Sequence, residues 1–187
     1  MNRLLFFITL LLTGQVAMSQ SNYRNWTVRE DVKKERIALI VANSDYTAGG
    51  SLDMPIPMAK KLEKSLIDKG FDVSVGHDLD RGEMIDIIGD FSKKYRSYKF
   101  AIIFYLGHGF QIDGENYLIP IDANPQSKSD VEVEAIDVEY VLKKVNDADI
   151  PKVIVLDACR DNPFEKKWSS AERSGNKNGF GDVSAPL

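Results

Sequence analysis

The sequence predicts an α/β protein, a three-layer α/β/α sandwich built around a mostly parallel sheet. Near-continuous apolar runs occur at residues 36–43, 100–106 and 152–157, which is typical of strands buried on both faces. The segments between them place apolar residues at helical spacing. Alternation of buried strands with amphipathic helices favours an open sheet covered by helices, with ligands bound outside the carboxyl ends of the strands.

Each further element has a local pattern of its own. A first helix is expected over Pro55–Lys69 and a second over Arg81–Tyr98, because apolar side chains fall on one face of each segment. Gly70 is a candidate helix C-cap, and the alternating segment Phe71–Val75 after it predicts a strand. A third helix is expected over Asp137–Val145, just before the last apolar run.

Composition narrows the classes of function. The 187 residues include 24 Lys and Arg against 28 Asp and Glu, which gives a net charge of −4 and the size of roughly one domain. Without a basic field, nucleic acid is not expected as a partner. The single cysteine, Cys159, cannot form an internal disulfide, and the only histidines are His77 and His108. No metal-site spacing results, so we predict neither a metal nor another cofactor.

The N-terminus predicts export. Arg3, the apolar run from Leu4 to Leu12 and the small residues of Ala17-Met18-Ser19 form the pattern of a secretory signal peptide, residues 1–19, cleaved after Ser19. The apolar run is too short for a membrane anchor, since a spanning helix needs about 20 residues. We therefore expect a secreted or periplasmic protein with no stable membrane insertion. An N-terminal arm or linker at 20–35, a domain at 36–164 and a flexible Gly/Ser/Lys-rich tail at 165–187 complete the predicted organisation.

Two of the predicted strands end in residues that carry chemistry. The strand at 100–106 leads into His108 between Gly107 and Gly109, and the strand at 152–157 leads to Cys159. If the strands are neighbours, the imidazole of His108 can take the proton of the Cys159 thiol, because the thiolate is the nucleophile. Backbone N–H groups of Gly109 and Cys159 would then stabilise an oxyanion. The pair indicates acyl transfer, whereas His77, in a short polar connection, is interpreted as having no catalytic role.

Three motifs resemble a known family. The segments YLGHG (residues 105–109), DGENYLIPID (113–122) and LDACRDNPF (156–164) are similar to the caspase-like domain of the metacaspase and bacterial caspase-homologue superfamily. RIALIVANSDY at 36–46 resembles the first strand and loop of that domain. The separation of His108 and Cys159, 159 − 108 = 51 residues, also fits the caspase-type gap. The resemblance implies a Cys-His dyad that cleaves peptide bonds in peptides or proteins without a metal.

The resemblance also implies a substrate pocket with departures from the family pattern. Asp157 matches the acidic residue that favours Arg or Lys as the substrate's P1 residue, the one before the cleaved bond. Leu106 stands where relatives carry a small residue, and Met58 stands where they carry a second pocket carboxylate. We therefore expect one acid in the pocket instead of two, and bulkier walls. Family domains continue past the nucleophile with further strands, so we expect this sequence to be either a large-subunit-like fragment or a protein that lacks part of its substrate groove.

These features leave two alternative functions. The complete dyad favours an exported caspase-like cysteine endopeptidase. Met58, Leu106 and the expected lack of C-terminal strands favour a catalytically weak or inactive binding module with the same fold. A redox-sensing thiol protein is disfavoured, because the chain has no second cysteine to resolve an oxidised Cys159.

Overall fold

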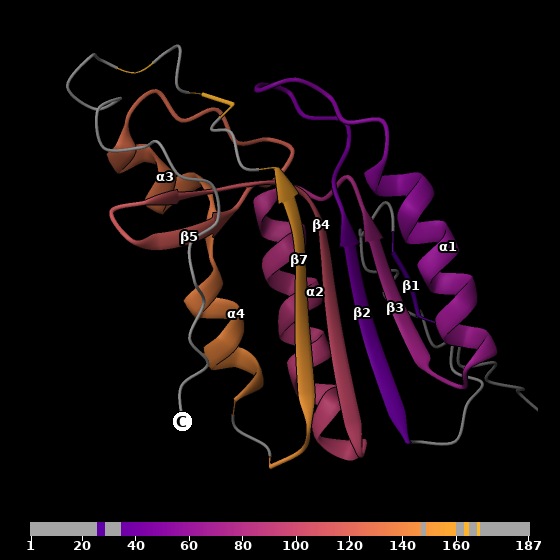
Figure 1. Ribbon diagram of the computed structural model, residues 1–187. Coiled ribbons are helices and arrows are strands. Elements are labelled where there is room, and N and C mark those ends of the chain that lie inside the picture. The colour runs from indigo at the N-terminus through magenta and orange to yellow at the C-terminus, as the bar shows by residue number, and fades with distance from the viewer. Residues whose placement is uncertain (1–25, 29–34, 147–148, 160–162, 165–167, 169–187) are drawn as a thin grey trace, which may run out of the picture.

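The computed structural model describes residues 26–28, 35–146, 149–159, 163–164 and 168 (Figure 1). The predicted signal peptide lies outside the described residues, as do most of the N-terminal arm and almost all of the tail. Among the described residues, the helices are all too short or too polar to cross a membrane.

A mostly parallel sheet forms the centre of the fold (Figure 1). Its parallel part has the order β3-β2-β4-β7, and β1 pairs antiparallel with the outer edge of β3. These strands are β1 (Trp26–Val28), β2 (Arg36–Ala42), β3 (Asp72–His77), β4 (Phe100–Ile112) and β7 (Lys152–Cys159). The predicted fold class is confirmed. Residues 26–28 of the predicted N-terminal arm form β1 and pair with β3, so this part of the arm is not a linker. This strand was not predicted from the sequence, because it has no long apolar run.

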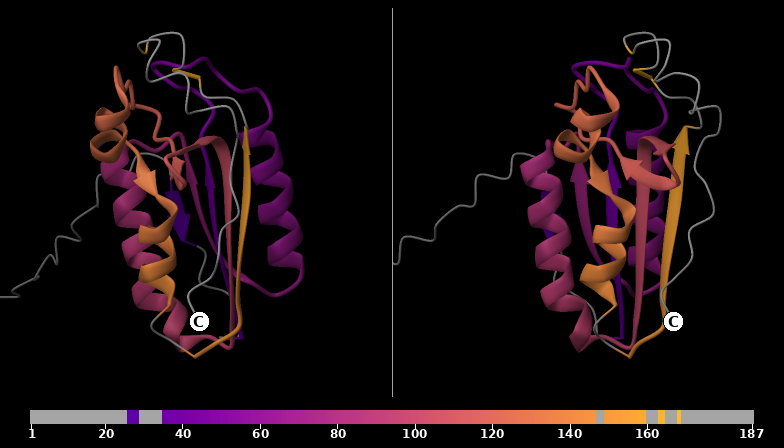
Figure 2. Two further views of the ribbon diagram at one scale, coloured as in Figure 1. Left: turned by 60° about the vertical axis from the view of Figure 1, so that its left-hand side comes forward. Right: turned by 90° about the vertical axis from the view of Figure 1, so that its left-hand side faces the viewer.

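Helices cover both faces of this sheet, as Figure 2 shows. Helix α1 (Pro55–Asp68) packs on one face. Helix α2 (Arg81–Lys94), which ends in the 3₁₀ turn η1 (Tyr95–Ser97), and α4 (Val138–Val145) pack on the other. The chain therefore leaves β2 over one face to reach β3, and returns over the other face to reach β4. Loops after β2 and β4 diverge at the carboxyl edge, where such a switch opens a binding crevice.

Strand β4 is longer than the sequence predicted. It does not end before His108 but continues to Ile112, and its last residues pair antiparallel with β5 (Glu115–Leu118). A two-residue turn, Asp113-Gly114, joins the two strands with φ of 50° and 94°, the type I′ geometry that Asp-Gly favours. Strand β6 (Ile136–Asp137) pairs with β5, and helix α3 (Lys128–Glu134) precedes it. His108 thus lies where β4 passes from one sheet to a hairpin.

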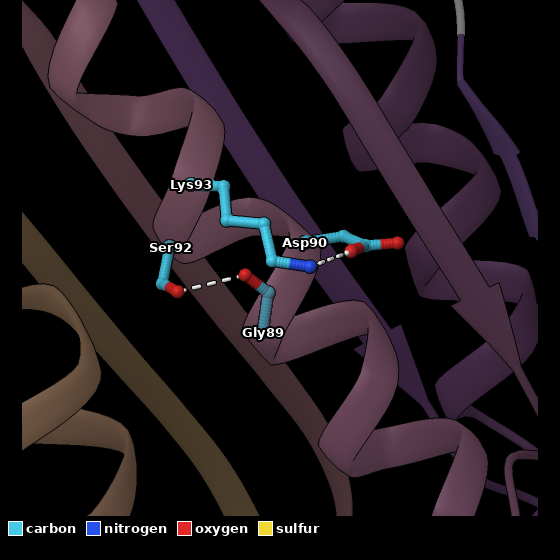
Figure 3. Close-up of polar contacts among 4 residues, drawn as sticks. All are labelled: Gly89, Asp90, Ser92 and Lys93. Atoms are coloured by element: carbon cyan, nitrogen blue, oxygen red, sulfur yellow. Dashed lines mark hydrogen bonds and ion pairs between the residues drawn. The ribbon is translucent and has the colours of Figure 1, made fainter.

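Local side-chain contacts stabilise both ends of helix α2. Asp80 caps its N-terminus by accepting from the Glu83 backbone N–H at 2.8 Å, while the Glu83 side chain accepts from the Asp80 N–H at 3.1 Å. In the last turns the buried Ser92 hydroxyl donates to the Gly89 carbonyl at 2.7 Å (Figure 3). Lys93 pairs with Asp90 at 2.8 Å on the exposed side. The backbone N–H groups of Asp80 and Glu83 at the helix start, and the buried hydroxyl of Ser92, therefore all have hydrogen-bond acceptors.

Candidate active site

The register of two parallel strands brings the predicted dyad together. Strands β4 and β7 pair from Ala101 opposite Lys152 to His108 opposite Cys159. Cys159 is therefore the last residue of β7, and not a loop residue that follows the strand. Residues directly opposite in adjacent strands have Cα atoms about 5 Å apart. The two strands thus present the histidine and the cysteine at the same level of the carboxyl edge.

The backbone of His108 is held by two tyrosines. Its N–H donates to the Tyr46 hydroxyl at 2.7 Å, and the Tyr46 ring lies 4.4 Å from the imidazole, centroid to centroid. Its carbonyl accepts from the Tyr105 hydroxyl at 2.6 Å and from the Ile119 N–H at 3.1 Å. With only 6% of its surface exposed, His108 has little freedom to move.

The two ring nitrogens of His108 have different environments. Nε2 lies 2.9 Å from the Gly50 carbonyl oxygen, and because a carbonyl can only accept, Nε2 carries the hydrogen. Nδ1 is buried and has no hydrogen-bond partner among the described residues. Burial lowers the pKa of His108 from the ordinary 6.5, against a smaller raising effect of the Gly50 carbonyl. At neutral pH the ring is therefore a neutral imidazole whose lone pair is on Nδ1, the form that a general base needs.

Glycine before the histidine is required by close packing. A Cβ at Gly107 would lie 2.4 Å from the Tyr46 hydroxyl oxygen and 2.9 Å from that of Tyr105. Both hydroxyls hold His108. The small residue therefore lets the hydroxyls of two tyrosines reach the histidine backbone.

Gly50 and Tyr46 belong to the loop between β2 and α1, residues 43–54, which is anchored at several points. At its start, the fully buried Asn43 accepts from the Leu79 N–H at 3.0 Å and donates to the carbonyls of Leu79 and Ile119. Further along, Thr47 donates through both its N–H and its hydroxyl to Ile121. The loop therefore presents the Gly50 carbonyl to His108 from a fixed frame.

The predicted substrate residues line one open cleft of about 440 Å³ beside the dyad. Asp157, Leu106 and Met58 all contribute to its wall, from β7, β4 and α1. The expectation of a single acid is wrong for this cleft, because Asp53 of the loop lines it as well. Its remaining lining residues are Ser51, Leu52, Met54, Pro55, Gly107 and Ala158. Two carboxylates thus share a cleft whose other walls are largely apolar.

The second histidine is separate from this arrangement. His77 is the last residue of β3, not part of a connection after it, and β2 lies between β3 and β4. Burial lowers its pKa from 6.5, with a further lowering by Lys60. In the described part of the chain, no three His, Cys, Asp or Glu side chains gather in a group that could hold a metal ion.

A helix-covered parallel sheet with a histidine and a cysteine opposite each other at the ends of adjacent strands is the arrangement of the caspase class of cysteine peptidases. A model of the caspase domain family matches residues 35–183, and the chain belongs to this family. Mucosa-associated lymphoid tissue lymphoma translocation protein 1 of Homo sapiens is 25% identical over 135 residues, which cover 72% of this chain and 16% of the relative. The Mus musculus homolog is 25% identical over 132 residues, 70% of this chain and 16% of that protein. The chain therefore matches only a small part of these curated relatives.

Sequence reasoning missed three residues of the site. Tyr46 lies within the segment that resembles the first strand and loop of the family domain, but nothing in a single sequence links its hydroxyl to His108. Gly50 acts through a backbone carbonyl, which has no sequence signature. Asp53 lies one residue before Met54, and only the path of the loop brings its carboxylate to the cleft. All three residues belong to loop 43–54, and the path of its backbone brings them to the site.

Proposed function

We propose that this chain is an exported cysteine endopeptidase that hydrolyses peptide bonds through Cys159 and His108. The observation that carries the proposal is the register that sets these residues opposite each other on β4 and β7, in a chain of the caspase domain family. The buried Nδ1 of His108, which has no partner among the described residues, gives a place for the thiol proton.

The chemistry follows from these positions. Nδ1 of His108 removes the proton from the Cys159 thiol, and the thiolate attacks the carbonyl carbon of the substrate. The oxygen then carries a negative charge, which the backbone N–H groups of Gly109 and Cys159 stabilise. As the C–N bond breaks, His108 returns the proton to the leaving amine, and a thioester remains on Cys159. A water molecule, deprotonated by His108, hydrolyses the thioester and restores the thiol.

The cleft supports a preference for Arg or Lys at P1. The aliphatic stem of such a side chain fits between Met58 and Leu106, and its charged head would meet Asp157 and Asp53. A carboxylate at P1 would add like-charge repulsion to the cost of desolvation. The substrate proposed is therefore a peptide or protein cut after a basic residue, and substrates with Asp at P1 should be rejected.

Labelling of the thiol tests the dyad. Protein beginning at residue 20 is treated with an irreversible thiol-directed peptide inhibitor carrying Arg at P1, and the label is mapped by mass spectrometry. Because Cys159 is the only cysteine, any thiol label is assigned without ambiguity. His108→Ala should slow labelling strongly, whereas the matched control His77→Ala should leave it unchanged. Equal rates for the two histidine variants at neutral pH would refute the dyad.

A panel of fluorogenic peptides that differ only at P1 tests the cleft. Asp157→Asn should lower kcat/KM for Arg at P1 by about 10- to 100-fold, the equivalent of one charge-assisted hydrogen bond, and should change cleavage after Gln much less. Asp53→Asn should show the same selectivity, because its carboxylate lines the same cleft. Efficient cleavage after Asp by the wild type, or equal losses for all P1 residues, would contradict this assignment and leave the dyad untouched.

A further inference from the structure

One carboxylate holds the first turn of loop 43–54 from a neighbouring strand end. Asp78, the residue after β3, accepts through Oδ1 from the backbone N–H of Ser44 at 2.7 Å and of Asp45 at 2.9 Å. Its own backbone has φ of 49°, a left-handed conformation that aspartate tolerates better than most residues. Hydrogen bonds to an ionised acceptor are stronger than neutral ones. A single side chain thus fixes two successive peptide groups.

A short path connects this anchor to the proposed general base. The carbonyl of Ser44, whose N–H is held by Asp78, accepts from the Leu52 N–H at 2.9 Å and closes the loop on itself. Gly50 lies inside this closed segment and bonds Nε2 of His108 at 2.9 Å. Tyr46, which follows Asp45, bonds the backbone of the same histidine. Both contacts of the loop with His108 therefore lie between Ser44 and Leu52.

We propose that Asp78 is a positioning residue for His108, because its carboxylate sets the loop so that the Gly50 carbonyl binds the Nε2 hydrogen and leaves Nδ1 for the thiol. The catalytic meaning of this inference rests on the proposed function, but the positioning itself does not. Asp78 lies on a different element from His108 and from Cys159, and it does not line the cleft. Its effect on chemistry must therefore pass through the loop.

Three substitutions separate the acceptor from other effects. Asp78→Gly keeps the left-handed backbone but removes the acceptor. Asp78→Asn keeps an acceptor oxygen and a residue that tolerates this conformation, and it removes only the charge. Asp45→Asn is the matched control, since it removes an exposed carboxylate beside the contact but leaves the backbone N–H that Asp78 binds.

Nuclear magnetic resonance of the imidazole groups gives a readout that does not need activity. The chain has two histidines, so ¹⁵N-histidine labelling yields two ring systems, which His77→Gln assigns. At alkaline pH both rings are neutral, and the Nε2 proton of His108 should be protected from exchange by the Gly50 carbonyl. Asp78→Gly should speed its exchange by at least about tenfold, the equivalent of one hydrogen bond. Asp78→Asn and Asp45→Asn should stay within about threefold of the wild type.

A second measurement uses the wild type alone and remains decisive if Asp78→Gly does not fold. The backbone amides of Ser44 and Asp45 should be protected from hydrogen exchange, and free exchange at both would overturn the inference. Unchanged exchange of the His108 proton in a folded Asp78→Gly variant would overturn it as well.

Activity then distinguishes the two proposals. If the chain is a peptidase, Asp78→Gly should lower kcat by about 10- to 100-fold, the scale of a misplaced catalytic group, and Asp78→Asn should recover most of it. One outcome would support the positioning role and refute the proposed function. In it, the Nε2 proton of His108 loses protection in Asp78→Gly, while Cys159→Ala cleaves peptides no differently from the wild type.

Discussion

Removing the side chain of Asn43 tests how the site is attached to the core. Asn43→Ala deletes a fully buried amide at the end of β2. Four hydrogen bonds disappear: the Leu79 N–H at 3.0 Å loses its acceptor, the carbonyls of Leu79 and Ile119 lose a donor, and the Met84 sulfur loses a weak contact at 3.5 Å. Those two carbonyls keep another donor, from Ile121 and Tyr105 respectively. Only the Leu79 N–H is left buried without a partner.

The magnitude follows from this inventory. An unsatisfied buried donor costs about 1–3 kcal/mol, and each of the two hydrogen bonds lost by the carbonyls contributes about 1 kcal/mol. The contact with the Met84 sulfur adds little, because a thioether is a weak acceptor. We therefore expect the free energy of unfolding to fall by about 3–5 kcal/mol. Urea unfolding followed by circular dichroism measures it. The exposed Asn146→Ala is the matched control and should change stability by less than about 0.5 kcal/mol. A loss below about 1 kcal/mol for Asn43→Ala would refute this account of the amide.

Asn43→Asp sharpens the test because it keeps the shape of the side chain. The new carboxyl group would face the carbonyls of Leu79 and Ile119, which repel its ionised form but accept from its protonated form. Its folded-state pKa should therefore be raised above the ordinary value of about 3.9. Stability is then retained below that value and lost as the pH rises, so the deficit relative to the wild type should grow from acidic to neutral pH. A deficit independent of pH would contradict the hydrogen-bond assignment.

Three further outcomes are expected. Tyr46→Phe should keep the ring contact with His108 but leave the histidine N–H without its acceptor, which should lower the free energy of unfolding by about 1–3 kcal/mol; urea titration would show no change if another acceptor replaces it. Gly107→Ala should destabilise by about 1–3 kcal/mol through overpacking against the tyrosines and reduce peptide cleavage, and a fully active variant would show that the tyrosines can move. Burial lowers the pKa of His77 and His108 below 6.5, so the unfolded chain binds protons more readily and stability should fall as the pH drops below 6.5, until the lowered folded-state pKa values are reached. The slope is at most about 1.4 kcal/mol per pH unit for each histidine, and His77→Gln should reduce it.

Long apolar runs predicted the central strands of the fold, but the short elements that follow β4 were not predicted. The buried runs at β2, β4 and β7 were recognised because strands covered on both faces are apolar throughout. The continuation of β4 into the hairpin with β5 was missed, although Asp113-Gly114 is a strong turn signal. Helix α3 was missed as well, because seven residues carry too little periodicity.

The candidate site was also predicted only in part. His108 and Cys159 could be singled out because they are rare residues at the ends of apolar runs. That they lie directly opposite each other depends on strand order and register, which the runs do not encode. The acidic character of the cleft was predicted from Asp157 but underestimated, because Asp53 enters it through a turn of the backbone.

The position of β7 has a consequence for synthesis. Among the described strands it is the last to leave the ribosome, and the strand that it joins, β4, is already central to the sheet. Pairing between them closes a long stretch of chain and so is a late event in folding. A nascent chain that lacks β7 carries the imidazole of His108 but not the thiol of Cys159, and so it lacks the nucleophile of the proposed dyad. If the chain is a peptidase, its activity can appear only after Cys159 has been synthesised.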